Sequence, residues 1–596
     1  MEKPLRILPG LENTMQRFIP DSADIEDPAA EPITVESASG IETWVDLSDA
    51  TIEVVKTSHP TGFPDSPREL AGALSDWAQA LGREYVVTSL DTIDRFSRST
   101  LPRSTRPAAV IRPGNALEVQ EVVRIAGQYG VPIYPISRGK NWGYGDACAV
   151  TDGQTIVDLS RMNAIREVNA ELAYAVVEPG VTQGQLSTYL REHEPSLWLD
   201  VSGAGPDASL VGNTLERGFG HTPYGDHFGH ACGLEVVLPT SELIHTGFGA
   251  FAKAKASRVF PWGVGPWLDG LFTQSNFGIV TALGLSLMRA PEQCLAFAFS
   301  VSDESRLGEV VEILRELRLD DVVRSSVHIA NDLRVISGNR QYPWEATGDI
   351  TPLPEDLRRA LRKEAGVGAW NVMGALYGPK PCVAAAQKLV RRAFAPFARV
   401  MFFDEQRLKM AQTILKWLNR IGVARHLAAK AEAVRSPYDM LRGIPSARHL
   451  RGAAWRSRVP VGPNGANPGD CGLIWVSPVL PMTRAACDEV LPIIADVLKQ
   501  YNFEPLITVT AISPRALCCV ASICYDRSDV TECSQASACY EQLFQSLAGR
   551  GYFPYRAGTH AMKMLAQLNP STAGTFLKIK QALDPQHILS PGRYEF

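Results

Sequence analysis

Residues 135–147 read PISRGKNWGYGDA, and basic and aromatic residues fill the gaps between the glycines. Two apolar segments with buried-strand character precede the loop, AAVIRP at 108–113 and VPIYPIS at 131–137. Between them, NALEVQEVVRIAGQYG at 115–130 places its apolar residues on one helical face. A glycine loop that follows a strand, a helix and a second strand presents backbone N–H groups to an anion. The stretch therefore predicts an anion-binding loop in an α/β arrangement.

Three phosphate-binding loops are candidates for this stretch, and a plain structural loop stays open beside them. A P-loop needs GxxxxGK followed by serine or threonine, whereas Lys140 directly follows the first glycine. A dinucleotide fingerprint needs GxGxxG at the start of a helix, but the order here is GxxxGxG and no helical pattern follows. The third candidate is a broad turn whose N–H groups surround a pyrophosphate, with glycines where a Cβ would block its approach.

The composition is that of a globular protein with more than one core. A chain of 596 residues predicts two domains, or one large domain with a cap. A net charge of −5 argues against nucleic acid as a partner. No apolar run is long enough to span a bilayer and no apolar signal core opens the chain, so we expect a cytoplasmic protein without a membrane partner. The eleven cysteines lack metal-ligand spacing, which predicts reduced, buried thiols and no metal site.

The patterns along the chain predict two folded regions behind an N-terminal arm. Residues 1–67 contain an acidic stretch rich in proline, alanine and serine at 20–42, which we interpret as a partly flexible extension. Strand patterns then continue to about residue 295. Beyond that point, helical stretches such as ESRLGEVVEILRELRL alternate with strand-like GAWNVMGALYG and LITVTAIS. This change indicates a separate α+β domain.

Segments from about residue 70 to the end resemble the flavoprotein family of vanillyl-alcohol oxidase, eugenol oxidase and the flavin subunit of p-cresol methylhydroxylase. They keep their order and spacing, which is more specific than a single glycine motif. The matching segments are PISRGKNWGYGDA, AYAVVEPGVTQGQL, VGNTLERGFGHTPYGDH, GLEVVLPTSELIHTGFGA, WGVGPWLDGLFTQSNFGIVTALGLSLM, GAWNVMGALYGP, GYFPYRAGTH and LDPQHILSPGRYEF. The resemblance implies a two-domain α+β fold of the p-cresol methylhydroxylase type. Its parts would be an FAD-binding domain at 68–295, an α+β substrate-binding cap at 296–550 and a C-terminal segment at 551–596 that returns to the FAD domain.

The resemblance also implies which residues bind the cofactor, FAD. In such proteins the glycine loop surrounds the pyrophosphate. Desolvation of its two charges is affordable only because backbone N–H donors take the place of the lost water. Arg593 would face the pyrimidine end of the flavin, where a cation stabilises the reduced form; the alternative is a solvated terminal charge. The implied cofactor-binding residues are Ser137, Arg138, Gly139, Lys140, Asn141, Gly143, Tyr144, Gly145, Pro179, Gly180, Val181, Gly212, Asn213, Gly218, Pro223, Tyr224, Gly225, Ser275, Asn276, Gly278, Ile279 and Arg593.

Tyr144, Tyr555 and Arg556 match the positions that bind a phenolic oxygen in the resembling enzymes. A phenol has a pKa near 10, so its use as a phenolate at neutral pH requires a cation and donors around the oxygen. Hydride would then leave the para α-carbon for the flavin and give a p-quinone methide. A structural hydrogen bond is the alternative for such a group. Thr508 is either a further polar contact or a satisfied strand hydroxyl.

Two features of the resembling enzymes are missing from this sequence. The histidine that carries a covalent flavin in some members aligns with Leu473, and the corresponding tyrosine of the methylhydroxylase aligns with Ala453. We therefore expect dissociable FAD, with a thioether to the nearby Cys471 as the lesser alternative to a buried, inert thiol. The aspartate that assists hydride transfer in the oxidases aligns with Gly203 or Ala204.

The expected pocket wall departs from the family at further positions. Asp207 is close in sequence to the position of the missing aspartate, although its side chain can point elsewhere. His449 replaces an active-site glutamate, either as a catalytic base near neutral pH or as a packing residue. The family's cap arginine aligns with Pro437, and a flavin-side tyrosine aligns with His221. These changes predict a substrate that differs from vanillyl alcohol and p-cresol.

The leading hypothesis is an FAD-dependent oxidoreductase that takes hydride from the benzylic or allylic carbon of a para-substituted phenol. Two alternatives stay open: a flavoenzyme that oxidises a non-phenolic alcohol in natural-product biosynthesis, and a flavin-binding subunit with little catalysis of its own. The expected partners are a small-molecule substrate, an electron acceptor that is either O₂ or a protein, and further copies of the chain in a homodimer or larger oligomer.

Overall fold

A computed structural model describes residues 67–420, 434–461, 470–568 and 570–595. Apart from Pro67, the predicted N-terminal extension at 1–67 lies outside the described residues. The described residues form one compact unit built from helices and three main sheets, as the predicted α+β fold requires. The boundaries at 295 and 550 stay a prediction.

A first sheet contains the predicted strand–helix–strand unit. Its strands, in spatial order, are β1 (Val86–Val87), β2 (Val110–Ile111), β4 (Thr155–Asp158) and β3 (Ile133–Ile136). β2, β4 and β3 run parallel, whereas β1 is antiparallel to β2. The helices of this region are α1 (Pro67–Leu81), α2 (Leu90–Phe96) and α3 (Ala116–Tyr129). The side chain of Asn115 caps α3 by accepting the Glu118 N–H at 2.9 Å, so the helix begins where the sequence predicts.

A second, antiparallel sheet carries the next stretch of chain. Its strands, in spatial order, are β5 (Ile165–Asn169), β6 (Tyr174–Val177), β10 (Ile279–Ser286), β8 (Ala231–Val237) and β9 (Leu243–His245). A separate pair joins β7 (Leu197–Trp198) to β11 (Met288–Arg289), and the helices are α4 (Gln183–His193) and α5 (Leu210–Leu215). Both faces of β8 and β10 are buried, because helices and loops cover them.

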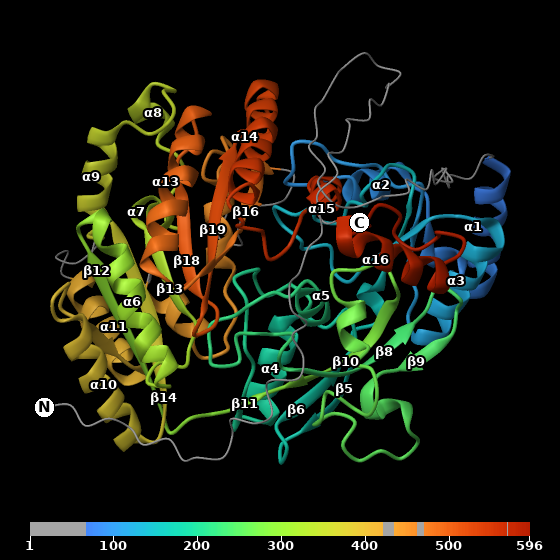
Figure 1. The fold of residues 1–596 in the computed structure, drawn as a ribbon, viewed down its shortest axis with the longest axis horizontal. Coiled ribbons are helices and arrows are strands. Elements are labelled where there is room, and N and C mark those ends of the chain that lie inside the picture. The colour runs from blue at the N-terminus through green and yellow to red at the C-terminus, as the bar shows by residue number, and fades with distance from the viewer. Residues whose placement is uncertain (1–66, 421–433, 462–469, 569, 596) are drawn as a thin grey trace, which may run out of the picture. The chain divides into compact units, whose positions relative to one another are not determined.

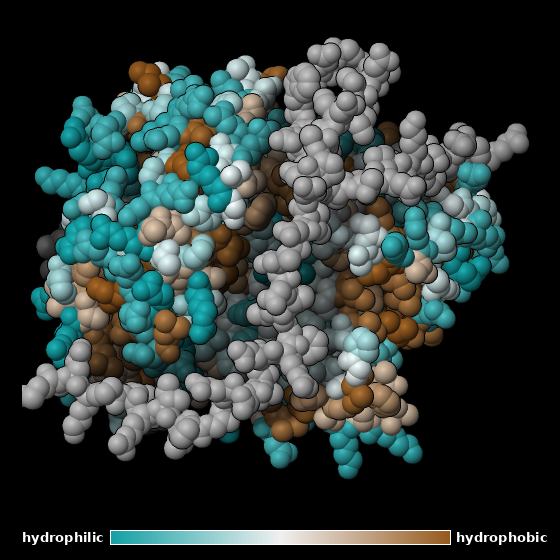
Figure 2. Space-filling model, viewed as in Figure 1, coloured by the Kyte–Doolittle hydropathy of each residue, from teal (hydrophilic) through white to brown (hydrophobic). Residues whose placement is uncertain are grey.

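The third sheet is antiparallel and carries the largest core. Its strands, in spatial order, are β15 (Met401–Phe403), β12 (Gln293–Val301), β14 (Trp370–Gly378), β13 (Val327–Asn331), β18 (Leu506–Ala511), β19 (Ala516–Tyr525) and β16 (Gly472–Val476), with β17 (Val479–Pro481) also paired to β19. The helices of this region are α6 (Leu307–Leu319), α7 (Asp332–Ser337), α8 (Trp344–Thr347), α9 (Glu355–Ala365), α10 (Lys380–Phe394), α11 (Glu405–Arg420), α13 (Arg484–Gln500) and α14 (Val530–Ala548). Where α9, α13 and α14 meet solvent, polar residues predominate (Figure 2).

The C-terminal segment returns to the first sheet through α15 (Met562–Leu568) and α16 (Pro570–Leu583) (Figure 1). The Ile133 N–H donates to the carbonyl of Ile588 at 2.8 Å, and the Ser590 N–H donates to the carbonyl of Ile133 at 2.8 Å. The ammonium of Lys580 is buried beside Asp584 at 2.6 Å. These contacts place the last residues of the chain beside β3, from which the glycine loop departs.

Two further observations concern the predictions from composition. No helix among the described residues has the length and apolar character that a membrane crossing requires. The cysteines of the described residues form no disulfide, and most of them are buried. Cys382 of α10 is exposed and Cys533 of α14 is half-buried at the edge of the largest core, so the prediction of buried thiols is wrong at those two positions.

Candidate active site

The glycine loop at 137–147 follows β3 and is anchored at its far end by Asp146. The buried Asp146 carboxylate accepts hydrogen bonds from the Thr100 N–H and hydroxyl, both at 2.7 Å, and from the Ser99 hydroxyl at 3.0 Å. Burial raises the pKa of this carboxyl, and these hydrogen bonds oppose that rise. The Gly143 N–H donates to the same Thr100 hydroxyl at 2.7 Å. The loop is therefore held in one conformation before any ligand binds.

The tyrosine of the loop stands between two glycines because the chain turns tightly on both sides of it. Gly143 has φ 73° and Gly145 has φ 124°, which are values that favour glycine. A Cβ on Gly143 would overlap the indole of Trp475, and one on Gly145 would lie 2.6 Å from the Thr559 hydroxyl oxygen. The sequence interpretation assigned the glycines to the approach of a pyrophosphate. At these two positions the protein's own side chains already exclude a Cβ.

The first half of the loop presents donors for which the protein supplies no acceptor. Within the described residues, no protein acceptor takes the backbone N–H groups of Arg138, Gly139, Lys140 and Asn141. The side chains of Arg138 and Lys140 likewise form no ion pair with the described carboxylates, and both line a cavity. Successive N–H groups beside two cations suit a diphosphate. This half of the loop therefore fits the diphosphate of FAD.

One cavity of about 1330 Å³ extends from this loop to the third sheet. It exceeds the roughly 300–1,000 Å³ of a pocket for one drug-sized ligand, so it has room for a cofactor and a substrate together. The predicted cofactor-binding residues that line it are Ser137, Arg138, Gly139, Lys140, Asn141, Tyr144, Gly212, Asn213, Gly218, Ser275, Gly278, Ile279 and Arg593. The others lie outside its lining; they are Gly143, Gly145, Pro179, Gly180, Val181, Pro223, Tyr224, Gly225 and Asn276.

Tyr144, Tyr555 and Arg556 come together on the wall of this cavity. The Arg556 guanidinium carbon lies 4.0 Å from the centre of the Tyr144 ring. The Tyr144 hydroxyl lies 3.1 Å from that of Ser477, and the Tyr555 N–H donates to the carbonyl of Ser477 at 3.1 Å. Burial raises the pKa of both tyrosines, so both are protonated hydrogen-bond donors at neutral pH.

Arg556 has one donor that the protein leaves without an acceptor. Its guanidinium donates to the side-chain oxygen of Asn141 and pairs with Glu216 at 3.3 Å. Its Nε is buried and has no hydrogen-bond partner among the described residues. Burial alone favours the neutral form, but the neighbouring tyrosines outweigh it and raise the pKa of Arg556. A permanent cation with an unused N–H therefore lines the cavity beside two hydroxyl groups.

Glu216 is an acidic member of this site that the sequence analysis missed. Its carboxylate also pairs with Arg593, whose guanidinium donates to the Tyr134 hydroxyl at 2.8 Å and to the carbonyl of Ser275 at 3.3 Å. Arg593 is thus neither a solvated terminal charge nor an isolated cation. Glu216 offsets part of the charge of Arg593 and joins it to Arg556, which lies earlier in the same C-terminal segment.

Two histidines face each other in the cavity wall. His221, at the position of the family's flavin-side tyrosine, and His328 of β13 have ring centres 4.4 Å apart. The Nδ1 of His221 lies 2.9 Å from the carbonyl of Val201, which makes Nδ1 the protonated nitrogen. Burial lowers the pKa of His221, although the nearby Asp200 opposes this. His328 was not predicted, although it alternates with buried residues in the strand pattern SSVHIAN.

The remaining predicted pocket positions divide between the cavity and its surroundings. Gly203, Ala204, Thr508 and Pro437 line the cavity. Asp207 is exposed and outside the lining, so its carboxylate does not replace the missing aspartate. His449 belongs to the 3-10 helix Ala447–Ala454, and its side chain lies outside the described residues.

The positions aligned with covalent flavin attachment lie in the core. Leu473, Ala453 and Cys471 are buried among apolar residues and do not line the cavity. Burial raises the pKa of the Cys471 thiol well above its ordinary value, which removes its nucleophilic thiolate at neutral pH.

Comparisons with known proteins agree with this geometry. A family model described as an FAD binding domain matches residues 107–247. A 1'-carboxy-chondrochloren decarboxylase of Chondromyces crocatus is 38% identical over 88% of this chain and 97% of its own length. The flavoprotein subunit of a hydroxylating 4-cresol dehydrogenase of Pseudomonas putida is 31% identical over 88% of this chain and 95% of its own length.

Solved structures of phenol-binding flavoproteins share the fold. p-Cresol methylhydroxylase with substrate bound aligns with a TM-score of 0.79 and 30% identity, over 89% of this chain and 98% of its own. The isoeugenol complex of the 4-ethylphenol oxidase from Gulosibacter chungangensis aligns with a TM-score of 0.81 and 28% identity, over the same shares of the two chains.

Proposed function

This chain belongs to the vanillyl-alcohol oxidase and p-cresol methylhydroxylase family and is an FAD-dependent oxidoreductase, and on that premise we propose that it oxidises a para-substituted phenol. The proposal places the phenolic oxygen between Tyr144, Tyr555 and Arg556. The unused Nε donor of Arg556 is the observation that carries it, because a buried donor without an acceptor costs about 1–3 kcal/mol.

The three side chains would ionise the phenol. A free phenol has a pKa near 10, so its ionisation at pH 7 costs about 4 kcal/mol. Each hydrogen bond to a charged group contributes about 1.5–3 kcal/mol, so one guanidinium donor and two hydroxyl donors supply this amount. FAD, when bound, accepts the hydride that leaves the benzylic or allylic carbon. The phenolate electrons move through the ring as that bond breaks, and the substrate becomes a p-quinone methide.

His221 and His328 are the candidate bases of the cavity. The acidic residues of its described lining are Asp146, Glu216 and Glu364. Asp146 accepts hydrogen bonds from Thr100, and Glu216 forms ion pairs with two arginines. Because burial lowers the pKa of His221, its neutral form prevails at neutral pH. A neutral imidazole can take a proton from water that adds to the quinone methide.

We also propose that FAD is held without a covalent bond, since the positions aligned with attachment are Leu473 and Ala453 in the core. Reoxidation by O₂ or by an electron-transfer protein, and assembly as a homodimer or larger oligomer, remain part of the proposal.

Oxidative decarboxylation is a second candidate, favoured by the similarity to the Chondromyces crocatus decarboxylase. If the substrate carries a carboxylate on the carbon next to the benzylic carbon, as 3-(4-hydroxyphenyl)propanoate does, hydride loss gives a quinone methide whose neighbouring CH₂ bears the carboxylate. The C–C electron pair released with CO₂ then forms the alkene and restores the phenolate. The two electrons leave as the hydride, so the products are a vinylphenol and CO₂, without added water.

The experiment is anaerobic mixing of the purified holoenzyme with 4-ethylphenol, with its methyl ether and with 3-(4-hydroxyphenyl)propanoate. We expect loss of flavin absorbance with a phenol and none with the ether, since the ether cannot ionise. Detection of 4-vinylphenol and CO₂ from the carboxylated phenol would support decarboxylation. Equal bleaching by phenol and ether, or bleaching by benzylic alcohols alone, would contradict the phenol proposal.

A further inference from the structure

Besides Arg138 and Lys140 of the glycine loop, a further cation lines the cavity without an ion pair among the described residues. Arg334 of α7 is part of the lining, yet within the described residues its guanidinium makes no hydrogen bond and no ion pair. Three other arginines of the lining have carboxylate partners. Arg556 and Arg593 share Glu216, and Arg340 pairs with Glu364 at 3.5 Å. Resting on the proposed phenol oxidation, we propose that Arg334 binds a carboxylate group of the substrate, so that the natural substrate is an anionic para-substituted phenol.

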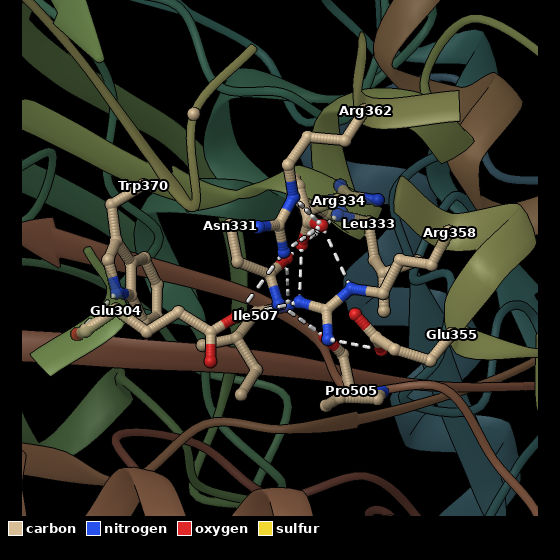
Figure 3. Close-up of polar contacts among 12 residues, drawn as sticks. Glu304, Asn331, Leu333, Arg334, Glu355, Arg358, Arg362, Trp370, Pro505 and Ile507 are labelled. Carbon is tan, nitrogen blue, oxygen red and sulfur yellow. Dashed lines mark hydrogen bonds and ion pairs between the residues drawn. The ribbon is translucent and has the colours of Figure 1, made fainter. Parts of the chain in front are cut away.

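The position of Arg334 is fixed by the start of its helix. The side-chain oxygen of Asn331 caps α7 by accepting the Arg334 N–H at 2.9 Å, and it also accepts the Ile507 N–H at 3.2 Å. The Asn331 amide donates to the carbonyl of Pro505 (Figure 3). The helix is thereby tied to β18, whose Thr508 lines the same cavity. A ligand therefore meets a guanidinium on a rigid support.

The acids near α7 are already used by other arginines. Asp332 is fully buried, and its two oxygens are taken by Arg358 at 2.7 Å and Arg362 at 2.6 Å. Glu304 pairs with the same two arginines at 2.9 Å and 3.4 Å (Figure 3). This cluster is balanced without Arg334. The positive charge of Arg334 thus remains available to the cavity.

Arg334 lies near the residues proposed to bind the phenol. Its guanidinium carbon is 5.5 Å from the centre of the Trp475 ring, within the range of a cation–π contact. The Trp475 indole N–H donates at 2.9 Å to the carbonyl of Trp142, which belongs to the same loop as Tyr144. Ser477, two residues after Trp475, meets the Tyr144 hydroxyl at 3.1 Å. Residues 475–477 therefore link Arg334, the proposed carboxylate-binding residue, to Tyr144, which is proposed to bind the phenol.

The chemistry of the site favours a carboxylate. Burial lowers the pKa of the Arg334 guanidinium, because the protein offers it no carboxylate. A planar guanidinium matches a carboxylate in geometry, and an incoming anion offsets the cost of burying the charge. The diphosphate of FAD is the other anion in the cavity, but Arg138, Lys140 and the free N–H groups of the loop are already present for it.

The test compares R334Q with wild type and with R340Q, which removes a cavity-lining arginine that has a partner. Each holoenzyme is mixed anaerobically with 4-propylphenol and with 3-(4-hydroxyphenyl)propanoate, and the second-order rate of flavin bleaching is measured. We expect R334Q to lower this rate about 10- to 100-fold for the carboxylated phenol only, the effect of losing a charge-assisted hydrogen bond. R340Q should leave both rates within about twofold of wild type.

Two further measurements distinguish the remaining outcomes. One is the binding of 3-phenylpropanoate, which has a carboxylate but no phenol, and the other is the FAD content of each purified variant. If neither phenol bleaches the flavin but 3-phenylpropanoate binds wild type and not R334Q, the phenol assignment fails and the carboxylate site survives. Equal effects of R334Q on both phenols, no effect on either, or no binding of any carboxylate to wild type would overturn the inference. Loss of FAD from R334Q would overturn it as well, because Arg334 would then serve the diphosphate.

Discussion

Replacing Tyr144 by phenylalanine removes one hydroxyl and keeps the ring that lies 4.0 Å from the Arg556 guanidinium carbon. In the account above, this hydroxyl stabilises a phenolate by about 1.5–3 kcal/mol. The rate constant kcat/KM at pH 7 should therefore fall about 10- to 150-fold. The same energy raises the pKa of the bound phenol by about one to two units, so much of the lost rate should return as the pH rises by that amount.

The assay is the initial rate of 4-ethylphenol oxidation from pH 6 to pH 10, with the unfolding temperature measured alongside. Y342F is the matched control, since Tyr342 is similarly buried and its hydroxyl donates to the carbonyl of Ile350 at 2.5 Å, outside the cavity lining. Each variant should lose about 0.5–1.5 kcal/mol of stability with its hydrogen bond. Only Y144F should lose activity.

Two results would refute the reasoning. A Y144F enzyme with unchanged kcat/KM at pH 7 would show that the hydroxyl does not contact the reacting phenol. A loss that is the same at every pH would show that the residue acts on something other than ionisation of the substrate.

Three further predictions concern the cofactor, the loop and one buried histidine. Acid precipitation should release all yellow colour into the supernatant; a yellow pellet would contradict non-covalent FAD. G143A, with a Cβ that overlaps Trp475 at φ 73°, should purify with little FAD, whereas G130A, at φ 64° in open space, should lose only about 1 kcal/mol and keep its flavin absorbance. His560 has no partner for either ring nitrogen among the described residues, and burial lowers its pKa to about 4. Because the unfolded pKa is about 6.5, His560 costs the folded state stability as the pH falls through that range. H560L should therefore gain about 3 kcal/mol relative to wild type between pH 7 and pH 4 in urea unfolding, and a constant difference would contradict this.

The parts of the site that could be predicted are those whose signal is local. The helix after Asn115 and the loop at 137–147 follow from apolar periodicity and glycine spacing within a few residues. The three residues to which we assign phenol binding were found through family resemblance, because no local pattern relates Tyr144 to Arg556 across the more than 400 residues between them.

The parts that escaped prediction depend on long-range pairing. Glu216 became part of the site because it meets Arg593, 377 residues away. His328 faces the cavity because β13 pairs with β14 and β18, and a register shift of one residue would turn its side chain to the other face. Arg334 lies in α7, which follows β13 and is tied to β18 through the side chain of Asn331. Among the described residues Arg334 has no ion pair, because Arg358 and Arg362 pair with the neighbouring Asp332. No pattern in the sequence reveals this choice of partners.

The central claim is that Arg556 and two hydroxyls hold the substrate as a phenolate. It is tested most directly by the ionisation state of a phenol that cannot react. Difference absorbance of 4-chlorophenol bound to the holoenzyme, titrated from pH 5 to pH 10, gives the pKa of the bound ligand. The account predicts a ligand that is ionised at pH 7 in wild type and an apparent pKa that returns toward 10 in R556M. A ligand that binds wild type as the neutral phenol, with the pKa it has in water, would contradict the account.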